Sequence, residues 1–339
     1  MYFTYYTNTC KYLTKQLLNN KDYKFIDVKN NEIKNIDEII IAEMGYNEKY
    51  NFMTKWLTSS CKKLGYIRDD YWHYTLNHKF KEEYIQWIDM SKPHLYHLEV
   101  NLISTCNLKC KSCSHFSQLC KSPDIMKLED FEDYMKRLSS IQIVNLYLLG
   151  GEPTLIKDLP ERFKIARKYF PDSTIAVLTN GTMLQQKDDT FYDSIRDNGI
   201  EIVLSLYPKY KHDEIKIRNF LIKKKVKFCI KRIITFIKTL TENNNNDPFI
   251  SQTKCLCEQC RFLHTDGRIY KCPISKMGLL MNEKYGTKFP ESKSVTIEEL
   301  VLNPSILDGP VEMCYYCSEK PKELNWKESK VVKKDDWIV

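Results

Sequence analysis

Residues 96–113 read YHLEVNLISTCNLKCKSC, a strand-like stretch that leads directly into three closely spaced cysteines. Residues 96–103 have the composition of a β-strand. Cys106, Cys110 and Cys113 follow in a C-x3-C-x2-C pattern. Three thiolates on one loop can each bind one iron of a [4Fe–4S] cluster and leave the fourth iron open to a small molecule. A zinc site is the alternative, with Cys120 or His115 as the fourth ligand. The spacing favours the cluster.

Strand-like and helix-like stretches alternate on both sides of this loop. The predicted strands are 96–103, 144–149, 174–178, 200–206 and 226–234. The predicted helices are 128–138, 158–170, 188–198 and 212–224. Such alternation is typical of βα units around a parallel sheet, and it predicts an α/β fold.

Three segments are predicted along the chain, with boundaries near Pro93 and in the polar stretch ENNNNDP at 242–248. Residues 1–94 form a mostly helical or winged-helix-like segment, because apolar residues recur at helical spacing in 36–44, 52–64 and 71–90. Residues 95–245 form the α/β core. Residues 246–339 are rich in cysteine and poor in regular elements, so this segment is expected to need a metal to fold.

Composition excludes several classes of protein. The 339 residues, 42% hydrophobic and 28% charged, suffice for a sizeable core. No apolar run approaches the roughly 20 residues of a membrane span, and the first residues do not resemble a signal peptide. We therefore expect a cytoplasmic protein without a membrane partner.

The net charge of +8 is a local feature of residues 209–238, which hold eleven Lys or Arg but only two acidic residues. Nucleic acid is therefore not the expected partner. The basic stretch would suit an anionic substrate, although a solvated helix face explains it equally well.

The chain has 13 cysteines. Clustered cysteines in a chain without a secretory signal bind metal or take part in catalysis more often than they form disulfides. Beside the first group, which includes Cys120, a second group consists of Cys255, Cys257, Cys260, Cys272, Cys314 and Cys317. Cys10, Cys61 and Cys229 stand alone, and we expect them to act as small buried apolar residues.

The first cysteine motif, followed about forty residues later by Gly150-Gly151-Glu152-Pro153, resembles the radical S-adenosylmethionine (SAM) superfamily. The resemblance implies a partial (β/α)6 TIM-like barrel with its site at the carboxyl ends of the strands. It also implies that Cys106, Cys110 and Cys113 bind three irons, while SAM chelates the fourth. Ser112 departs from the superfamily, which usually has an aromatic residue there; His115 or Phe116 would then pack near the adenine.

The same resemblance implies a set of SAM contacts. Gly150 and Gly151 would let the backbone approach the ligand, and Glu152 would accept a hydrogen bond from the SAM amino group. Asn180, in a Thr-Asn-Gly motif after the third strand, and Ser205, after the fourth, would also lie near SAM. Arg218 would face the SAM carboxylate. A turn residue at 180 and a solvated helix residue at 218 are the alternatives.

The second cysteine group resembles the SPASM extension of this superfamily, or its shorter twitch form. The shared pattern is one cysteine, then Gly267-x4-Cys272, then Cys314-x2-Cys317. Family spacing favours Cys255 or Cys257 as the first ligand and leaves Cys260 uncertain. Six cysteines fit one four-thiolate auxiliary iron–sulfur cluster, and a structural zinc knuckle is the alternative.

The activity implied is reductive cleavage of SAM to a 5′-deoxyadenosyl radical, which abstracts hydrogen from a substrate. A flavodoxin or ferredoxin would supply the electron, and an auxiliary cluster would bind the substrate or accept an electron. No acid or base is assigned.

Residues 31–70 resemble a winged-helix unit that grips a leader peptide. We therefore expect modification of a ribosomally made peptide. If the segment is instead a helical cap, oxidation, dehydration or epimerisation of a carbohydrate, aminoglycoside or nucleotide sugar follows. A zinc-stabilised nucleic-acid-binding protein is the remote alternative.

Overall fold

The computed structural model describes residues 91–253, 255 and 260–339, together with five short strands nearer the N-terminus. The chain divides into two compact units. The first comprises residues 1–96 with 141–144 and 172–174, and the second comprises residues 97–140, 145–171 and 175–339.

The first unit contains a five-stranded sheet with the order β2-β1-β3-β4-β5. Its strands are β1 (Tyr2–Thr4), β2 (Lys24–Ile26), β3 (Glu38–Ile41), β4 (Lys63–Ile67) and β5 (Ile85–Asp89). β1 pairs in parallel with β2 and β3, and β3 pairs in parallel with β4. β5 is antiparallel to β4.

β3 contradicts the helix predicted at 36–44, and β5 contradicts the last part of the helix predicted at 71–90. The helix predicted at 52–64 meets β4 only at residues 63–64, and its other residues lie outside the described part of the chain. β3 contains Ile39-Ile40-Ile41, and such a run of β-branched residues favours a strand, while a short apolar run does not separate helix from strand by period. The winged-helix unit at 31–70 stays a prediction, because most of these residues lie outside the described part of the chain. The two described strands of this range, β3 and β4, pair in parallel, whereas the strands of a hairpin are antiparallel. The rest of these predictions, with Cys10 and Cys61, lies outside the described residues.

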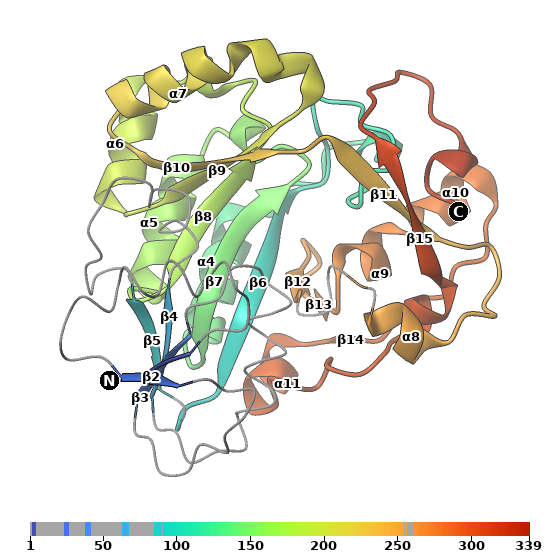
Figure 1. Ribbon diagram of the computed structural model, residues 1–339, viewed down its shortest axis with the longest axis horizontal. Helices are drawn as coiled ribbons and strands as arrows, with labels where there is room; N and C mark the ends of the chain where they lie inside the picture. The colour runs from blue at the N-terminus through green and yellow to red at the C-terminus, as the bar shows by residue number, and fades with distance from the viewer. Residues whose placement is uncertain are drawn as a thin grey trace. The chain divides into compact units, whose positions relative to one another are not determined.

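The second unit is built on the predicted α/β alternation (Figure 1). Its strands are β6 (His94–Ile103), β7 (Gln142–Gly150), β8 (Thr174–Thr179), β9 (Glu201–Leu206) and β10 (Lys227–Arg232). The helices between them are α4 (Leu128–Leu138), α5 (Leu159–Tyr169), α6 (Asp189–Asp197) and α7 (Glu214–Lys223). Figure 1 shows these helices along one face of the sheet. The predicted α/β core is confirmed.

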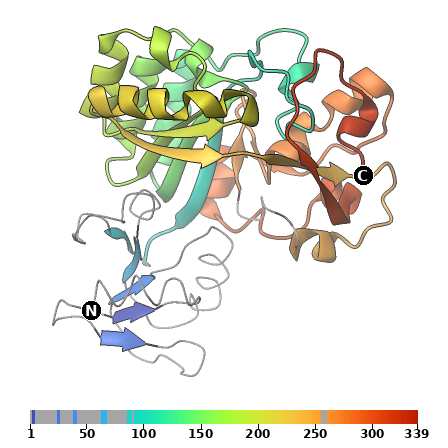
Figure 2. The same cartoon turned by 45° about the horizontal axis from the view of Figure 1, so that its top comes forward.

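The sheet is open and does not close into a barrel. Its order is β10-β9-β8-β7-β6-β12-β13-β14, with β8, β9 and β10 in parallel. Figure 2 shows β10 leading on into β11 (Thr235–Leu240). β11 pairs with β15 (Cys317–Asn325) and adds no strand to the sheet. Among the described residues, the core therefore has five consecutive barrel strands where six were expected.

Short elements make up the C-terminal part of this unit. The strands are β12 (Phe262–Leu263), β13 (Ile269–Tyr270) and β14 (Ser294–Val295). The helices are α8 (Pro248–Thr253), α9 (Pro273–Met277), α10 (Leu280–Tyr285) and α11 (Ile297–Leu302). Six 3-10 turns are also present in the described chain: η2 (Ser117–Leu119), η3 (Pro153–Leu155), η4 (Leu184–Gln186), η5 (Pro208–Asp213), η6 (Glu312–Tyr316) and η7 (Lys334–Asp336).

The polar stretch at 242–248 packs onto the C-terminal segment. Asn246 Nδ2 donates to the carbonyl of Tyr315 at 3.1 Å, and the backbone N–H of Asp247 donates to Glu319 at 2.7 Å. Core and cysteine-rich part therefore belong to one compact unit. The boundary at 245 stays a prediction.

The two faces of β6 differ in chemistry. Leu98, Val100 and Leu102 are fully buried on one face. The intervening positions carry His97, Glu99 and Asn101, because successive side chains of a strand point to opposite faces. A central strand of the sheet therefore has one polar face.

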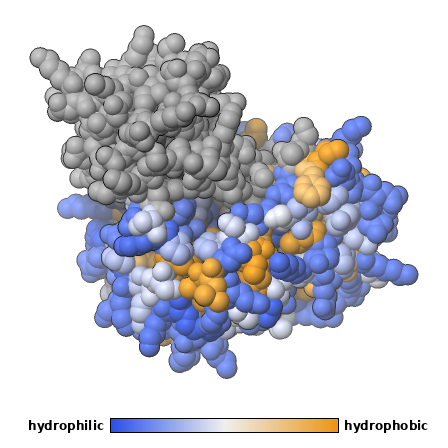
Figure 3. All heavy atoms as spheres, turned by 90° about the horizontal axis from the view of Figure 1, so that it is seen from below, coloured by the Kyte–Doolittle hydropathy of each residue, from blue (hydrophilic) through white to orange (hydrophobic). Residues whose placement is uncertain are grey.

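No helix among the described residues has the length and apolar character that a membrane crossing requires. On the face drawn in Figure 3, the described atoms are mostly hydrophilic, with small apolar patches between them.

Candidate iron–sulfur and SAM site

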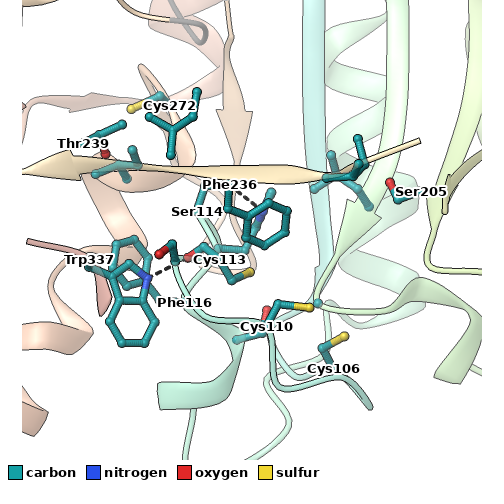
Figure 4. A pocket seen from close by; sticks show the side chains of 18 of the residues that line it. Cys106, Cys110, Cys113, Ser114, Phe116, Ser205, Phe236, Thr239, Cys272 and Trp337 are labelled. Atoms are coloured by element: carbon teal, nitrogen blue, oxygen red, sulfur yellow. Dashed lines mark hydrogen bonds between the residues drawn. The ribbon is translucent and has the colours of Figure 1, made fainter. Parts of the chain in front are cut away.

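The loop after β6 places all three predicted cysteines on one cavity. Cys106, Cys110 and Cys113 line a cavity of about 600 Å³ (Figure 4). The loop turns sharply because Ser112 and Phe116 have left-handed backbones, with φ of 60° and 51°. The arrangement fits a cluster with three protein ligands, since three thiols converge on one side of a space that a small molecule can enter.

The thiols lie close enough to influence one another. The pKa values of Cys106 and of Cys110 are raised to about 12. Burial is the main cause, and the charge of Cys113 contributes to the same shift. Burial also raises the pKa of Cys113. Such thiols stay protonated without metal and give up their protons on binding iron, so metal binding here is linked to pH.

Gly150 and Gly151 hold the end of β7 against the cysteine loop. A Cβ on Gly150 would overlap the carbonyl of Ile103, and one on Gly151 would overlap that of Thr105. The N–H of Gly151 donates to the Ile103 carbonyl at 2.6 Å. The glycines thus allow two backbones to touch. Their predicted close approach to SAM stays a prediction, although both line the cavity.

Glu152 joins the end of β7 to the end of β8. Only 1% of the residue is exposed. Its carboxylate accepts hydrogen bonds from the Thr154 N–H at 3.0 Å, the Thr179 hydroxyl at 2.7 Å and the Asn180 N–H at 2.8 Å. Burial raises the pKa of Glu152 above its ordinary value. The carboxylate is therefore largely committed within the protein, and its first effect is to position Asn180.

Asn180 lies beside the first cysteine. Its Nδ2 donates to Asn107 Oδ1 at 2.8 Å and lies 3.7 Å from Cys106 Sγ. Ser205, at the end of β9, also lines the cavity (Figure 4). Both predicted residues are thus brought to the cysteine loop.

Arg218 is not brought there. It lies on α7 with 46% of its side chain exposed, and it donates to Glu214 at 3.3 Å, one helical turn away. It is absent from the residues that line the cavity. The prediction that it faces the SAM carboxylate is therefore wrong, because an i,i+4 ion pair holds it on the helix surface.

Four cysteines of the second group line the same cavity: Cys255, Cys272, Cys314 and Cys317. Burial raises the pKa of Cys272 to about 12, with a further contribution from the charge of Cys255. Charges on Cys272, Cys255 and Cys314 likewise add to the effect of burial on Cys317. Four thiols that interact electrostatically and line one cavity suit a four-thiolate centre.

The remaining second-group cysteines go elsewhere or are not described. Cys260 lies against β6, with its Sγ 3.7 Å from Glu99 Oε1, and does not line the cavity. Of the three candidates for the first ligand, the structure thus brings Cys255 to the others and separates Cys260. Cys257 lies outside the described residues. Cys229 is buried, as expected for an isolated cysteine.

The fourth-ligand candidates for a zinc site on the first loop also separate. Cys120 does not line the cavity, and its thiol points to the Phe116 carbonyl at 3.9 Å. His115 does line it. Phe116, a candidate neighbour of adenine, is buried and stacks on Trp337 with centroids 5.5 Å apart.

The last residues of the chain cover the cysteine loop, which the sequence did not reveal. Trp326 Nε1 donates to Cys110 Sγ at 3.3 Å. Trp337 Nε1 donates to the Cys113 carbonyl at 2.9 Å, the bond drawn in Figure 4. The Lys111 N–H donates to the Lys327 carbonyl at 2.9 Å. More than 200 residues separate these partners, so no local sequence pattern predicts that they meet. The sequence feature that could have indicated a buried contact is the pair of tryptophans in a highly charged segment.

Tyr207 is a second residue that sequence reasoning missed. It follows β9, lines the cavity and stacks on Trp326 with centroids 5.0 Å apart. Phe236 of β11 meets its edge at 5.9 Å. Burial raises the pKa of Tyr207 well above its ordinary value, and the charges of the three cysteines add to this. The phenol therefore stays neutral at the cavity wall.

The fold and the site define an open α/β barrel with two thiol sets around one cavity. Residues 100–250 match the model of the radical SAM superfamily. The matched residues make up less than half of the chain.

Curated relatives match about a third of the chain. A probable GTP 3′,8-cyclase of Pyrococcus abyssi is 33% identical over 106 residues, which cover 31% of this chain and 32% of that protein. A GTP 3′,8-cyclase of Nautilia profundicola is 28% identical over 118 residues, which cover 34% of this chain and 36% of the relative. The chain therefore spans about a third of the length of the relatives it matches.

A solved structure, BtrN in complex with AdoMet and 2-DOIA, is similar with a TM-score of 0.45 at 17% identity. The match covers 66% of this chain and 93% of that one.

Proposed function

We propose that this protein is a radical SAM enzyme that removes a hydrogen atom from a small, hydroxyl-bearing substrate of carbohydrate type. The observation that carries the proposal is the single cavity of about 600 Å³ lined by both thiol sets. Cys106, Cys110 and Cys113 would hold the SAM-cleaving [4Fe–4S] cluster. The auxiliary cluster would be held by Cys255, Cys272, Cys314 and Cys317. A substrate between them would be within reach of both centres.

When bound, the first cluster and SAM supply a 5′-deoxyadenosyl radical that removes hydrogen, and an auxiliary cluster supplies an electron acceptor or a substrate ligand. The chain's own residues position and enclose these groups. Asn180 and Ser205 present polar side chains beside the first cysteine loop. Leu149, Leu178 and Phe236 contribute apolar wall that excludes water.

The cavity wall is mostly apolar, but it also carries a few polar groups that a substrate could bind. Thr235 and Thr239 of β11 and Glu323 of β15 line it. Hydroxyl and carboxylate groups at these positions can bind substrate hydroxyl or amino groups, which fits a carbohydrate or an aminoglycoside. The relatives named GTP 3′,8-cyclase favour a small substrate, because GTP is a small molecule. They match about a third of this chain.

Peptide modification was the first expectation from sequence, and it rested on a winged-helix unit at 31–70. The described strands of this range, β3 and β4, pair in parallel, which is not the antiparallel pairing of a winged-helix hairpin. A peptide substrate therefore becomes an outcome of the test.

The test uses anaerobically reconstituted protein with dithionite. Wild type should contain about eight irons with matching sulfide, as two four-iron clusters require. A triple variant with Ala at Cys106, Cys110 and Cys113 should retain about half of this iron and form no 5′-deoxyadenosine. Cys229→Ala is the matched control, because Cys229 is buried but lies outside the cavity. Persistent 5′-deoxyadenosine from the triple variant would contradict the proposal.

Substrate class is tested by the increase in 5′-deoxyadenosine formation above the uncoupled rate. Aminoglycosides and free sugars should increase it, with loss of two mass units for an oxidation. An increase with GTP or with short peptides alone would reject the carbohydrate class while leaving SAM cleavage intact.

A further inference from the structure

A third group of ligand-type side chains lies outside the two thiol sets that line the cavity. His97 and Glu99 of β6 meet Cys260, which comes two residues before β12. One ligand atom from each residue lies within 4.8 Å of those from the other two. None of the three residues lines the cavity.

The fold brings these residues together by strand pairing. His97 and Glu99 are two residues apart on β6, so their side chains share a face. β12 pairs with β6 in parallel, with Phe262 opposite Glu99, and the Glu99 N–H donates to the Arg261 carbonyl at 2.7 Å. This register places Cys260 beside Glu99. The polar face of β6 noted above is therefore covered by a thiol.

The contacts between these groups have the dimensions of a coordination shell. Glu99 Oε1 lies 3.4 Å from His97 Nε2 and 3.7 Å from Cys260 Sγ. Ligands of a tetrahedral zinc ion, with bonds of about 2.0–2.3 Å, lie roughly 3.3–3.6 Å apart. The observed separations match this range closely enough for one ion to bridge all three groups.

The site is buried and has unsatisfied polar atoms. His97 is 5% exposed, Cys260 is 6% exposed, and the Glu99 side chain is 13% exposed. Among the described residues, Glu99 Oε2 and His115 Nε2 are buried without a hydrogen-bond partner. A buried carboxylate oxygen left without a partner costs on the order of 1–3 kcal/mol or more. A bound cation would remove that cost.

His115 lies near the same carboxylate. The Glu99 carboxylate lies in an enclosed site, 3.4 Å from the His97 ring nitrogen and close enough to His115 to interact with it electrostatically. His115 comes from the first cysteine loop, so a group bound here would contact β6, β12 and that loop together.

We propose that His97, Glu99 and Cys260 bind a zinc ion. A mixed set of imidazole, carboxylate and thiolate donors suits zinc and does not suit Mg²⁺ or Ca²⁺, which prefer oxygen ligands. The ion joins the central barrel strand to the cysteine-rich part of the chain, and its role is structural. The site is separate from both proposed clusters and does not depend on the proposed reaction.

The test is metal analysis of the intact, reconstituted protein after dialysis against excess zinc. Wild type and Cys229→Ser, a buried cysteine outside the site, should each hold one zinc per chain. Cys260→Ser and Glu99→Gln should bind zinc roughly tenfold or more weakly than wild type under the same conditions, because even indirect ligand changes cost that much affinity. Iron and sulfide should stay at the wild-type level in Glu99→Gln. Zinc at the wild-type level in Cys260→Ser, or no zinc in wild type, would overturn the proposal.

X-ray absorption at the zinc edge of the wild-type protein decides the matter if the variants do not fold. The expected shell has one sulfur at about 2.3 Å and three nitrogen or oxygen atoms at about 2.0–2.2 Å. A shell of three or four sulfurs would mean that zinc occupies a cluster site, and it would reject the assignment. A shell without sulfur would reject it as well.

Discussion

The first thiol set lies within residues 106–113 of one loop, whereas the second gathers from positions between 255 and 317. The first loop is fixed from several sides by backbone contacts, from Gly151 at the end of β7 and from the C-terminal residues around Lys327. The second set comes from separate short elements, with Cys272 next to α9, Cys314 in η6 and Cys317 at the start of β15. A metal centre should therefore bind to the first loop without being needed for its fold. In the second thiol set, a metal centre should help to hold the ligand-bearing elements together.

The largest expected effect comes from the first set. Cys106→Ala should reduce SAM cleavage at least 100-fold, because an incomplete ligand set does not hold the cluster. The unfolding midpoint should stay within a few degrees of wild type, since the loop is held by β6, β7 and the C-terminal segment. Measurement of 5′-deoxyadenosine and of thermal unfolding checks both. A variant that unfolds as readily as one from the second set would remove the contrast between the two regions.

Changes in the second set should act on folding. Cys317→Ala should reduce soluble yield several-fold and lower auxiliary iron, because metal binding contributes free energy to the folding of the separate short elements that the metal joins. The first cluster should still assemble, at about four irons per chain. Iron analysis and solubility, with Cys229→Ala alongside, test this. Full iron content with a wild-type spectrum would show that this set binds no cluster.

Gly151→Ala probes how the first loop is fixed. The added methyl group would overlap the Thr105 carbonyl, so the end of β7 must move away from the cysteine loop. We expect a loss of about 1–3 kcal/mol of unfolding free energy and weaker SAM binding. Gly309→Ala is the control, because its Cβ would meet no atom within 4 Å. Equal denaturation midpoints for the two variants would contradict this account of Gly151.

The smallest expected effect concerns the tryptophan over Cys110. Trp326→Phe keeps an aromatic ring against Tyr207 but removes the N–H that donates to Cys110 Sγ. A hydrogen bond to a ligand sulfur stabilises the reduced cluster, so its loss should lower the reduction potential by an amount on the order of tens of millivolts. Redox titration followed by electron paramagnetic resonance measures the shift.

Trp337→Phe serves as the comparison for that titration, since its N–H donates to a backbone carbonyl rather than to sulfur. A shift of the same size in both variants would assign the effect to packing and not to the hydrogen bond.

The sequence by itself determined the α/β core and the first thiol set. Strand and helix positions follow from local periodicity, and α4 begins and ends at the predicted residues. The pattern of Cys106, Cys110 and Cys113 is local as well, so its meaning does not depend on folding. Short-range signals failed where they were ambiguous, as in Ile39–Ile41, where three apolar residues fit either element.

Tertiary structure alone decided which distant residues meet. It placed Cys255 with Cys272, Cys314 and Cys317, and it placed Cys260 against Glu99, although both cysteines belong to one short stretch of sequence. It kept Arg218 on the surface of α7 and brought Trp326 to Cys110. The physical reason is that the meeting of the cysteines, and the contacts of Cys260 and Trp326, depend on strand register and chain reversal between residues that lie far apart in the sequence, 161 residues for Cys260 and 216 for Trp326. Residue spacing along the chain carries no record of either.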